Sequence, residues 1–328
     1  MKYLHLIRYK NLLFIAALQY LMRFAIIEPI MRVFAIPVAT NNLHFSLLVI
    51  ATIFIAAAGY VINDYFDTRI DAINRPDKVI VGVSVSKEQA MLMHQILTGI
   101  GVAAGLWVAY AAHSLTVGLI MVMIPGLLWF YSASYKRQFL IGNIIVALTA
   151  AFVPLVVIQT ESAFLQKEYG ELILQTPVLP QLYGWVCGFA LFAFFITWIR
   201  EVIKDMEDEE GDREMESRTL PIKWGMKYAK LFLYGLIAIT LGLLAYARFG
   251  LIHFPNDTLT TRYLIFGLFL PFAYLVYLIV KAKTPEDFHQ ASTFTKFIMI
   301  IGVLYSVIFY FLQAKIFGIS FLNLFLVQ

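Results

Sequence analysis

Long apolar runs separated by short polar segments repeat along the whole chain. Nine of these runs approach or exceed the roughly 20 apolar residues that a helix needs to cross a bilayer. We predict membrane-spanning helices at 11–27, 45–64, 89–112, 114–133, 140–160, 181–203, 228–250, 262–281 and 294–318. Segments 161–180 and 251–261 carry no cluster of charges and are expected to be connections. The pattern therefore predicts an all-α polytopic membrane protein, and we expect one transmembrane domain over residues 1–328.

The composition agrees with this prediction. Hydrophobic residues make up 61% of the 328 residues, charged residues make up 14%, and the mean hydropathy is +0.78. These values are too apolar for an ordinary soluble domain. A net charge of +4 would suggest nucleic acid in a soluble chain, but here the basic residues follow membrane topology, so we expect no nucleic-acid partner. The single cysteine, Cys187, excludes an intrachain disulfide.

Basic residues alternate between the two sides of the predicted spans. With a cytoplasmic N-terminus, the outside segments hold only Arg32, Lys167, Arg248, Arg262 and Lys315. This asymmetry is typical of the positive-inside rule. Arg23 lies within the first predicted span, where a charge costs roughly 2.5–3.5 kcal/mol on insertion scales, so we expect it to face a polar interior.

A densely charged segment ends the second predicted span. If it is helical, Asn63, Asp67 and Asp71 lie at successive i, i+4 positions and project from one face. Like charges at that spacing repel, so this face needs a compensating positive charge. Oxygen-only ligands suit a hard cation such as Mg²⁺, and the metal would in turn recruit an anion.

A second acidic segment ends the sixth predicted span. If it is helical, Asp205, Asp208 and Asp212 also share one face. Both segments fall on the predicted cytoplasmic side, so we expect an integral protein of the cell inner membrane with its site facing the cytoplasm. Taken singly, each segment could be a solvated loop whose carboxylates cap helices. Cations that could bind a phosphate on the same side are Arg75, Lys78, Lys136 and Arg137.

These segments carry a family resemblance. Asn63-Asp64-x-x-Asp67-x-x-x-Asp71 resembles the NDxxDxxxD motif of the UbiA superfamily of intramembrane prenyltransferases. Asp208-x-x-x-Asp212 resembles the second aspartate motif of that family. The segment 131–137, followed by Gly142-Asn143, is similar to the family's segment after the fourth helix, and nine spans match the family fold.

The resemblance implies a reaction and a set of site residues. Such enzymes bind a prenyl diphosphate through Mg²⁺, ionise its allylic C–O bond and let an acceptor capture the prenyl cation. The implied metal ligands are Asn63, Asp67, Asp71, Asp208 and Asp212, with Asp64 and Asp205 as catalytic auxiliary groups. The implied diphosphate contacts are Arg75, Lys78, Lys136 and Arg137.

The resemblance implies that the acceptor is a lipid or an aromatic compound. Segments 73–77 and 218–221 are most similar to the branch that prenylates a hydroxyl of geranylgeranylglyceryl phosphate. Segment 79–81 departs from the archaeal pattern, so a 4-hydroxybenzoate-type quinone precursor remains an alternative acceptor. A membrane transporter with interfacial carboxylates is an alternative of another class, but it predicts ionisable residues at all membrane depths. A CDP-alcohol phosphotransferase would need a glycine in its DxxDG-type motif, where this chain has Thr68 and Arg69 after Asp67.

Overall fold

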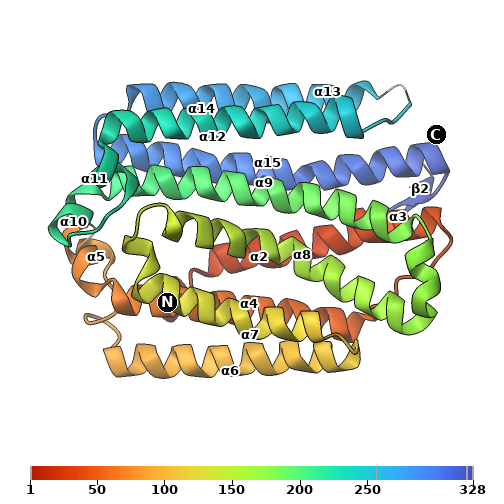
Figure 1. Ribbon diagram of the computed structural model, residues 1–328, viewed down its shortest axis with the longest axis horizontal. Helices are drawn as coiled ribbons and strands as arrows, with labels where there is room; N and C mark the ends of the chain where they lie inside the picture. The colour runs from red at the N-terminus through yellow and green to blue at the C-terminus, as the bar shows by residue number, and fades with distance from the viewer. Residues whose placement is uncertain (1, 75, 256, 323, 327–328) are drawn as a thin grey trace. The chain divides into compact units, whose positions relative to one another are not determined.

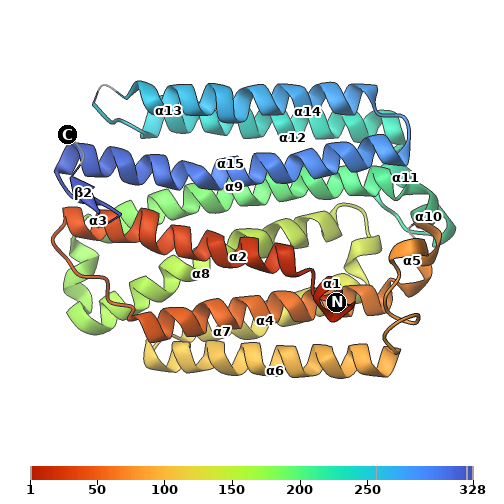
Figure 2. The same cartoon turned by 180° about the vertical axis from the view of Figure 1, so that it is seen from behind.

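The chain forms two compact, largely helical units. The computed structural model describes residues 2–74, 76–255, 257–322 and 324–326. Unit 1 comprises residues 1–136 and 152–187, and unit 2 comprises residues 137–151 and 188–328. Figures 1 and 2 show the long helices of each unit from two sides. The prediction of one domain over residues 1–328 stays a prediction.

Within the described ranges, nine helical segments are long and apolar enough to cross a membrane. Each of them overlaps one of the predicted spans, which confirms the prediction of an all-α polytopic membrane protein. The nine segments are Tyr9–Val33, Asn42–Phe66, Lys87–Ala111, Leu115–Ala133, Ile141–Gln175, Val178–Glu207, Met226–Leu251, Thr258–Lys281 and Pro285–Phe317.

Unit 1 is built around α4 (Asn42–Phe66), which packs against α6 (Lys87–Ala111) and α7 (Leu115–Ala133). The start of α4 is fixed because the Asn41 side chain accepts a hydrogen bond from the His44 amide at 2.9 Å. A capping box of Ser86 and Gln89 starts α6 in the same way. The remaining elements of unit 1 are α1 (Lys2–Leu6), α2 (Tyr9–Leu21), η1 (Met22–Ile27), α3 (Glu28–Val33), α5 (Thr68–Asn74), η2 (Pro76–Lys78) and η4 (Gly170–Gln175).

The fifth membrane helix is longer than the sequence pattern predicts. Helix α8 runs over Ile141–Tyr169, whereas residues 161–180 were expected to form a connection. The helix continues because residues 160–165 are all buried, including the polar Glu161. Its carboxylate accepts hydrogen bonds from the backbone amides of Ala39 at 2.6 Å and Thr40 at 3.1 Å. Glu161 follows the apolar run at 140–160, but its carboxylate binds the loop at Ala39 and Thr40, and α8 continues beyond it.

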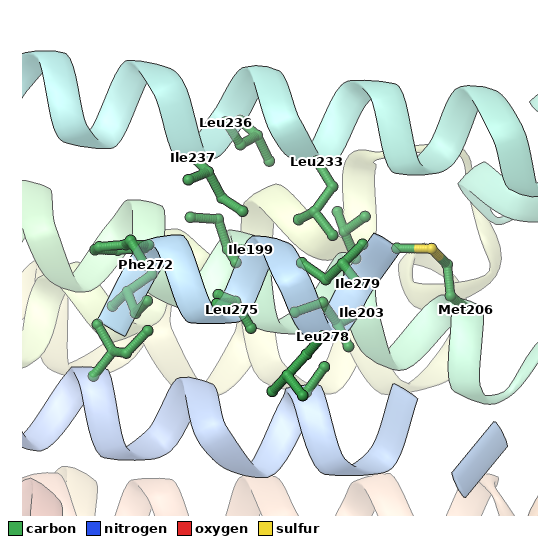
Figure 3. Close-up of a cluster of buried hydrophobic side chains, with 14 of the residues drawn as sticks. Ile199, Ile203, Met206, Leu233, Leu236, Ile237, Phe272, Leu275, Leu278 and Ile279 are labelled. Atoms are coloured by element: carbon green, nitrogen blue, oxygen red, sulfur yellow. The ribbon is translucent and has the colours of Figure 1, made fainter. Parts of the chain in front are cut away.

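Unit 2 has a core made by three of its helices. Figure 3 shows apolar side chains of α9 (Val178–Glu207), α12 (Met226–Tyr246) and α14 (Leu270–Lys281) pointing toward one another. Ile203, Leu233 and Leu275 are fully buried in this cluster. The other elements of unit 2 are α10 (Glu209–Glu214), α11 (Leu220–Trp224), η5 (Ala247–Leu251), α13 (Thr258–Tyr263), η6 (Leu264–Phe269), α15 (Pro285–Phe317) and a hairpin of β1 (Ser320–Phe321) and β2 (Phe325–Leu326). The segment between the fourth and fifth spans holds η3 (Tyr135–Arg137).

Candidate active site

In unit 1, the carboxylate of Asp67 contacts a side-chain amide and a cation. Asp67 is 6% exposed. One of its oxygens, Oδ2, accepts a hydrogen bond from Asn63 Nδ2 at 2.7 Å. The other, Oδ1, forms an ion pair with the Lys136 ammonium, whose side chain is 13% exposed. Lys136 therefore supplies one positive charge beside the first acidic motif.

The motif keeps helical register although the helix changes direction. Helix α4 ends at Phe66 and α5 begins at Thr68, with Asp67 between them at φ −87° and ψ 0°. The Asp67 amide still donates to the Asn63 carbonyl at 3.0 Å, and the Asp71 amide donates to the Asp67 carbonyl at 2.8 Å. These are the i to i−4 bonds of an α-helix. The i, i+4 spacing therefore holds across the junction, although the motif lies on two helices that meet at Asp67.

Asp64 is held by a residue from the start of the chain. Arg8 Nη2 donates to Asp64 Oδ1 at 2.9 Å, and the Arg8 guanidinium lies over the Tyr60 ring at 4.9 Å from its centroid. Arg8 adopts a left-handed backbone conformation, with φ 51°, between α1 and α2. Such a conformation costs energy in a non-glycine residue. Asp64 is therefore fixed beside the motif by a contact between distant parts of the sequence.

Two of the predicted diphosphate contacts cannot be placed. Arg75 lies outside the described residues, and Lys78 belongs to η2 with a side chain outside them. Arg137 belongs to unit 2, where its carbonyl accepts a hydrogen bond from the Arg218 amide at 2.8 Å. Of the four predicted cations, Lys136 alone is thus seen among the described side chains to contact a motif carboxylate.

In unit 2, Asn143 fixes the orientation of Asp205. Asn143 is 7% exposed, and its Nδ2 donates to Asp205 Oδ2 at 2.9 Å. The pairing has the same chemistry as that of Asn63 and Asp67 in unit 1: a side-chain amide donates to one oxygen of a motif carboxylate. It leaves the remaining lone pairs of the carboxylate available for a cation or a water molecule.

The second motif also sits at a helix junction. Helix α9 ends at Glu207, and Asp208 precedes α10. The Asp208 amide donates to the Lys204 carbonyl at 2.9 Å, and the Asp212 amide donates to the Asp208 carbonyl at 3.0 Å. Asp212 is 9% exposed. As in unit 1, the register continues across the junction, while a continuous helix through the motif is not formed.

Neighbouring carboxylates in unit 2 are engaged with basic side chains. Glu201 is paired with Arg200 and Lys204, each at 3.0 Å. Glu207 contacts His289 Nδ1 at 2.8 Å. Arg200 and Lys204 neutralise Glu201, which, like Glu207, is not part of the motif spacing. Glu201 and Glu207 therefore have structural partners and are not candidate metal ligands.

The donor chemistry of both motifs fits Mg²⁺ bound together with a phosphate. All candidate ligands are carboxylate or amide oxygens, which Mg²⁺ prefers. Within the described ranges, no three His, Cys, Asp or Glu side chains come together as a ready-made metal site. Mg²⁺ is commonly held by one or two carboxylates, waters and substrate phosphates, so a preformed protein cage is not required. Asn63, Asp67 and Asp71 could hold one such ion, and Asp208 and Asp212 could hold another.

Sequence reasoning missed the partners of the motif carboxylates. Asn143 follows the motif-like segment after the fourth span, and this position was the one available signal for it. Arg8 carries no signal beyond its place in a basic N-terminal segment. Both residues act through contacts across 56 to 62 positions of sequence, which spacing patterns do not reveal.

The sequence comparisons agree with these motifs. The chain matches the UbiA prenyltransferase family over residues 31–301. It is 30% identical to digeranylgeranylglyceryl phosphate synthase of Methanosphaera stadtmanae over 253 aligned residues. The alignment covers 76% of this chain and 82% of that protein.

Solved structures share the fold. A structure of digeranylgeranylglyceryl phosphate synthase aligns with a TM-score of 0.62 and 26% identity, covering 94% of this chain and 97% of that one. A UbiA homologue from Archaeoglobus fulgidus, bound to GPP and Mg²⁺, aligns with a TM-score of 0.53 and 19% identity over 92% of this chain and 98% of that one. The second likeness is one of fold alone.

Proposed function

We propose, from the premise that this chain belongs to the UbiA prenyltransferase family, that it transfers a geranylgeranyl group to geranylgeranylglyceryl phosphate. The donor of this group is geranylgeranyl diphosphate. The observation that carries the proposal is the Asn63–Asp67–Lys136 cluster, in which a buried motif carboxylate is paired with an ammonium. The printed names of the relatives support the glycerol phosphate acceptor.

The reaction breaks the allylic C–O bond and forms a C–O bond to the acceptor. The diphosphate leaves with the electron pair, and the acceptor hydroxyl loses its proton as its oxygen bonds to the prenyl carbon. When bound, Mg²⁺ supplies Lewis-acid stabilisation of the leaving diphosphate. We propose Asn63, Asp67 and Asp71 as ligands of one such ion and Asp208 and Asp212 as ligands of another, and the Mg²⁺ in the Archaeoglobus fulgidus homologue supports this choice of metal.

Basic side chains add to the stabilisation of the leaving group. Lys136 is proposed to bind a diphosphate oxygen as a point charge while it remains near Asp67. Arg75, Lys78 and Arg137 are the other proposed contacts. Asp64 and Asp205 are proposed as auxiliary catalytic groups, and each is fixed by a hydrogen bond from Arg8 or Asn143.

We also propose that the protein lies in the cell inner membrane with its aspartate motifs facing the cytoplasm. The excess of basic residues on that side of the predicted spans supports this orientation. The membrane helices themselves make the protein an integral membrane protein.

An acceptor panel tests the proposed function. Membranes containing the chain are incubated with radiolabelled geranylgeranyl diphosphate, Mg²⁺ and either geranylgeranylglyceryl phosphate or 4-hydroxybenzoate. Membranes containing the Asp67→Ala variant serve as the control. We expect a labelled lipid product with the glycerol phosphate acceptor only. Prenylated 4-hydroxybenzoate as the main product would overturn the acceptor, and no product with either would overturn the proposed donor and acceptor pair.

A further inference from the structure

A pocket lies at the opposite end of unit 1 from the first aspartate motif. It opens where the first membrane segment ends and α4 begins, with a volume of about 360 Å³. The motif follows the other end of α4, about 37 Å away for a helix of 25 residues. In Figure 2, α3 and α5 mark these two ends of the unit. The pocket is therefore separate from the candidate active site.

The polar part of the pocket consists of two arginines, one glutamate and one asparagine. Arg23 is 6% exposed, and its Nη2 donates to the Thr40 carbonyl at 2.7 Å and to Asn42 Oδ1 at 3.2 Å. These contacts confirm that Arg23 faces a polar interior. Both acceptors are neutral, so the hydrogen bonds orient the guanidinium without cancelling its charge.

The second arginine of the lining is Arg32 on α3. Arg32 forms an ion pair with Glu28 one helical turn earlier on α3, and their side chains are 27% and 21% exposed. The side chains that line the pocket carry two positive charges and one negative charge. Glu161 of α8, outside the lining, also interacts electrostatically with Arg23. The pocket therefore suits an anion with no more than one negative charge.

The rest of the lining is apolar, and the pocket lies at the boundary of the membrane. Met31 and Ile36 form part of its wall, and Phe24, which also lines it, is 40% exposed. Charged and apolar side chains lining one pocket, at the level where two spans end, suit an amphiphile better than a free ion. A phospholipid headgroup presents such a combination at this depth.

We propose that this pocket binds the anionic headgroup of a membrane phospholipid, a phosphodiester of charge −1 that bears a hydroxylated group. Arg23 and Arg32 contact the phosphodiester oxygens, because guanidinium groups match phosphate geometry. Glu28 keeps lone pairs beyond those used by Arg32 and accepts a hydrogen bond from the headgroup hydroxyl. A choline headgroup is disfavoured, because it adds a positive charge beside two arginines.

The test measures lipid binding by the purified full-length protein in a neutral detergent. The protein is titrated with dioleoylphosphatidylglycerol, dioleoylphosphatidylcholine or inorganic phosphate, and bound lipid is counted by native mass spectrometry alongside the apparent Tm. We expect phosphatidylglycerol to bind the wild-type protein and raise its Tm. We expect phosphatidylcholine and inorganic phosphate to bind at least about tenfold more weakly.

Variants separate this pocket from other lipid contacts. Arg32→Gln removes one cation, and Val38→Asp adds a carboxylate to the lining without touching either arginine. We expect each to weaken phosphatidylglycerol binding about tenfold. Lys167→Gln is the matched control, because it removes an exposed cation of α8 in the same unit outside the pocket.

The proposal is overturned if both pocket variants, monodisperse on size exclusion, bind phosphatidylglycerol as tightly as the wild-type protein does. It is also overturned if inorganic phosphate alone gives the Arg32-dependent shift, because the ligand would then be a free anion. Retained binding in Lys167→Gln together with weakened binding in the two pocket variants supports it.

Discussion

Asp67 is the carboxylate whose loss should affect the candidate active site most. It is buried, accepts from Asn63 and is paired with Lys136. Asp67→Ala removes a metal ligand and also the carboxylate that pairs with the partly buried Lys136 ammonium, a loss that is costly at such a place. We expect turnover at saturating Mg²⁺ to fall by about 10²–10³-fold. Initial rates of prenyl transfer, measured on protein with an unchanged size-exclusion profile, test this expectation.

Asp77→Ala is the matched control for this change. Asp77 is an exposed carboxylate in η2, a few residues after the motif, and is not a proposed ligand. Its variant should keep the wild-type rate. If Asp67→Ala also kept it, the metal assignment would be wrong.

Lys136 should act on the diphosphate more than on the acceptor. Its ammonium already lies against a motif carboxylate, so a diphosphate bridged to that carboxylate would come within its reach. Lys136→Ala should cost roughly 1.5–3 kcal/mol of binding, or one to two decades in the KM for the prenyl diphosphate. Lys136→Arg should recover part of the loss, because the charge survives while the geometry changes. Steady-state kinetics with each substrate varied in turn measure the two effects separately.

Lys87→Ala provides the comparison for Lys136. Lys87 begins α6 in the same unit and lies over the Tyr65 ring at 5.6 Å from its centroid. Like Lys136, it places a positive charge at this end of the unit, but it contacts no proposed metal ligand in the described structure. Lys87→Ala therefore measures the effect of losing a cation there without losing the contact to Asp67. An effect of Lys136→Ala confined to the KM of the acceptor would contradict the assigned role.

At the scale of residues, the sequence predicts the motif positions but not their partners. The spacing of Asn63, Asp67 and Asp71 is local, so the i, i+4 register follows from helix geometry alone. The contacts of Arg8 and Asn143 depend on how distant helices pack, which local periodicity does not encode.

At the scale of elements, the packing of α15 against α9 in unit 2 depends on Gly302. A Cβ at position 302 would overlap the Phe192 ring. Because the ring is itself packed in the core, it cannot move away freely. Gly302→Ala should therefore destabilise the protein by roughly 1–3 kcal/mol, despite the better helix propensity of alanine. A lower apparent Tm of detergent-purified protein would be the measured result.

Gly242→Ala tests whether the effect comes from the overlap. Gly242 lies within α12, where an added Cβ meets open space. This variant should be neutral or stabilised by up to about 1 kcal/mol, because alanine favours the helix. Equal losses of stability in the two variants would argue against the overlap with Phe192.

Helix lengths show where local patterns fail. The first membrane segment extends to Val33 and α8 to Tyr169, beyond the apolar runs at 11–27 and 140–160. Each segment contains a charged residue that is satisfied by another part of the chain. Arg23, inside the first run, donates to the Thr40 carbonyl, and Glu161, just after the second run, accepts from the Thr40 amide. The backbone of a single loop residue thus satisfies one charged side chain in each segment.

At the scale of the whole molecule, the hydrophobic pattern predicts the membrane segments well. A span needs about 20 apolar residues whatever its tertiary contacts are, so the signal is contained in each segment. Which loops face the cytoplasm is predicted from a weaker signal, the count of basic residues in each loop. This count concerns the orientation of the protein in the membrane and not the packing of its helices.

Cysteine labelling tests this sidedness directly. In a Cys187→Ser background, single cysteines replace Asp77 and Glu210, which are exposed residues beside the first and second motifs. An even number of predicted spans separates them, so a membrane-impermeant maleimide should reach both only after inverted vesicles expose the cytoplasmic face. A cysteine at Glu168, an exposed position near the end of α8, should label from the opposite face and shows that the vesicles are sealed. Labelling of positions 77 and 210 from opposite faces would contradict the proposal that both motifs face the cytoplasm.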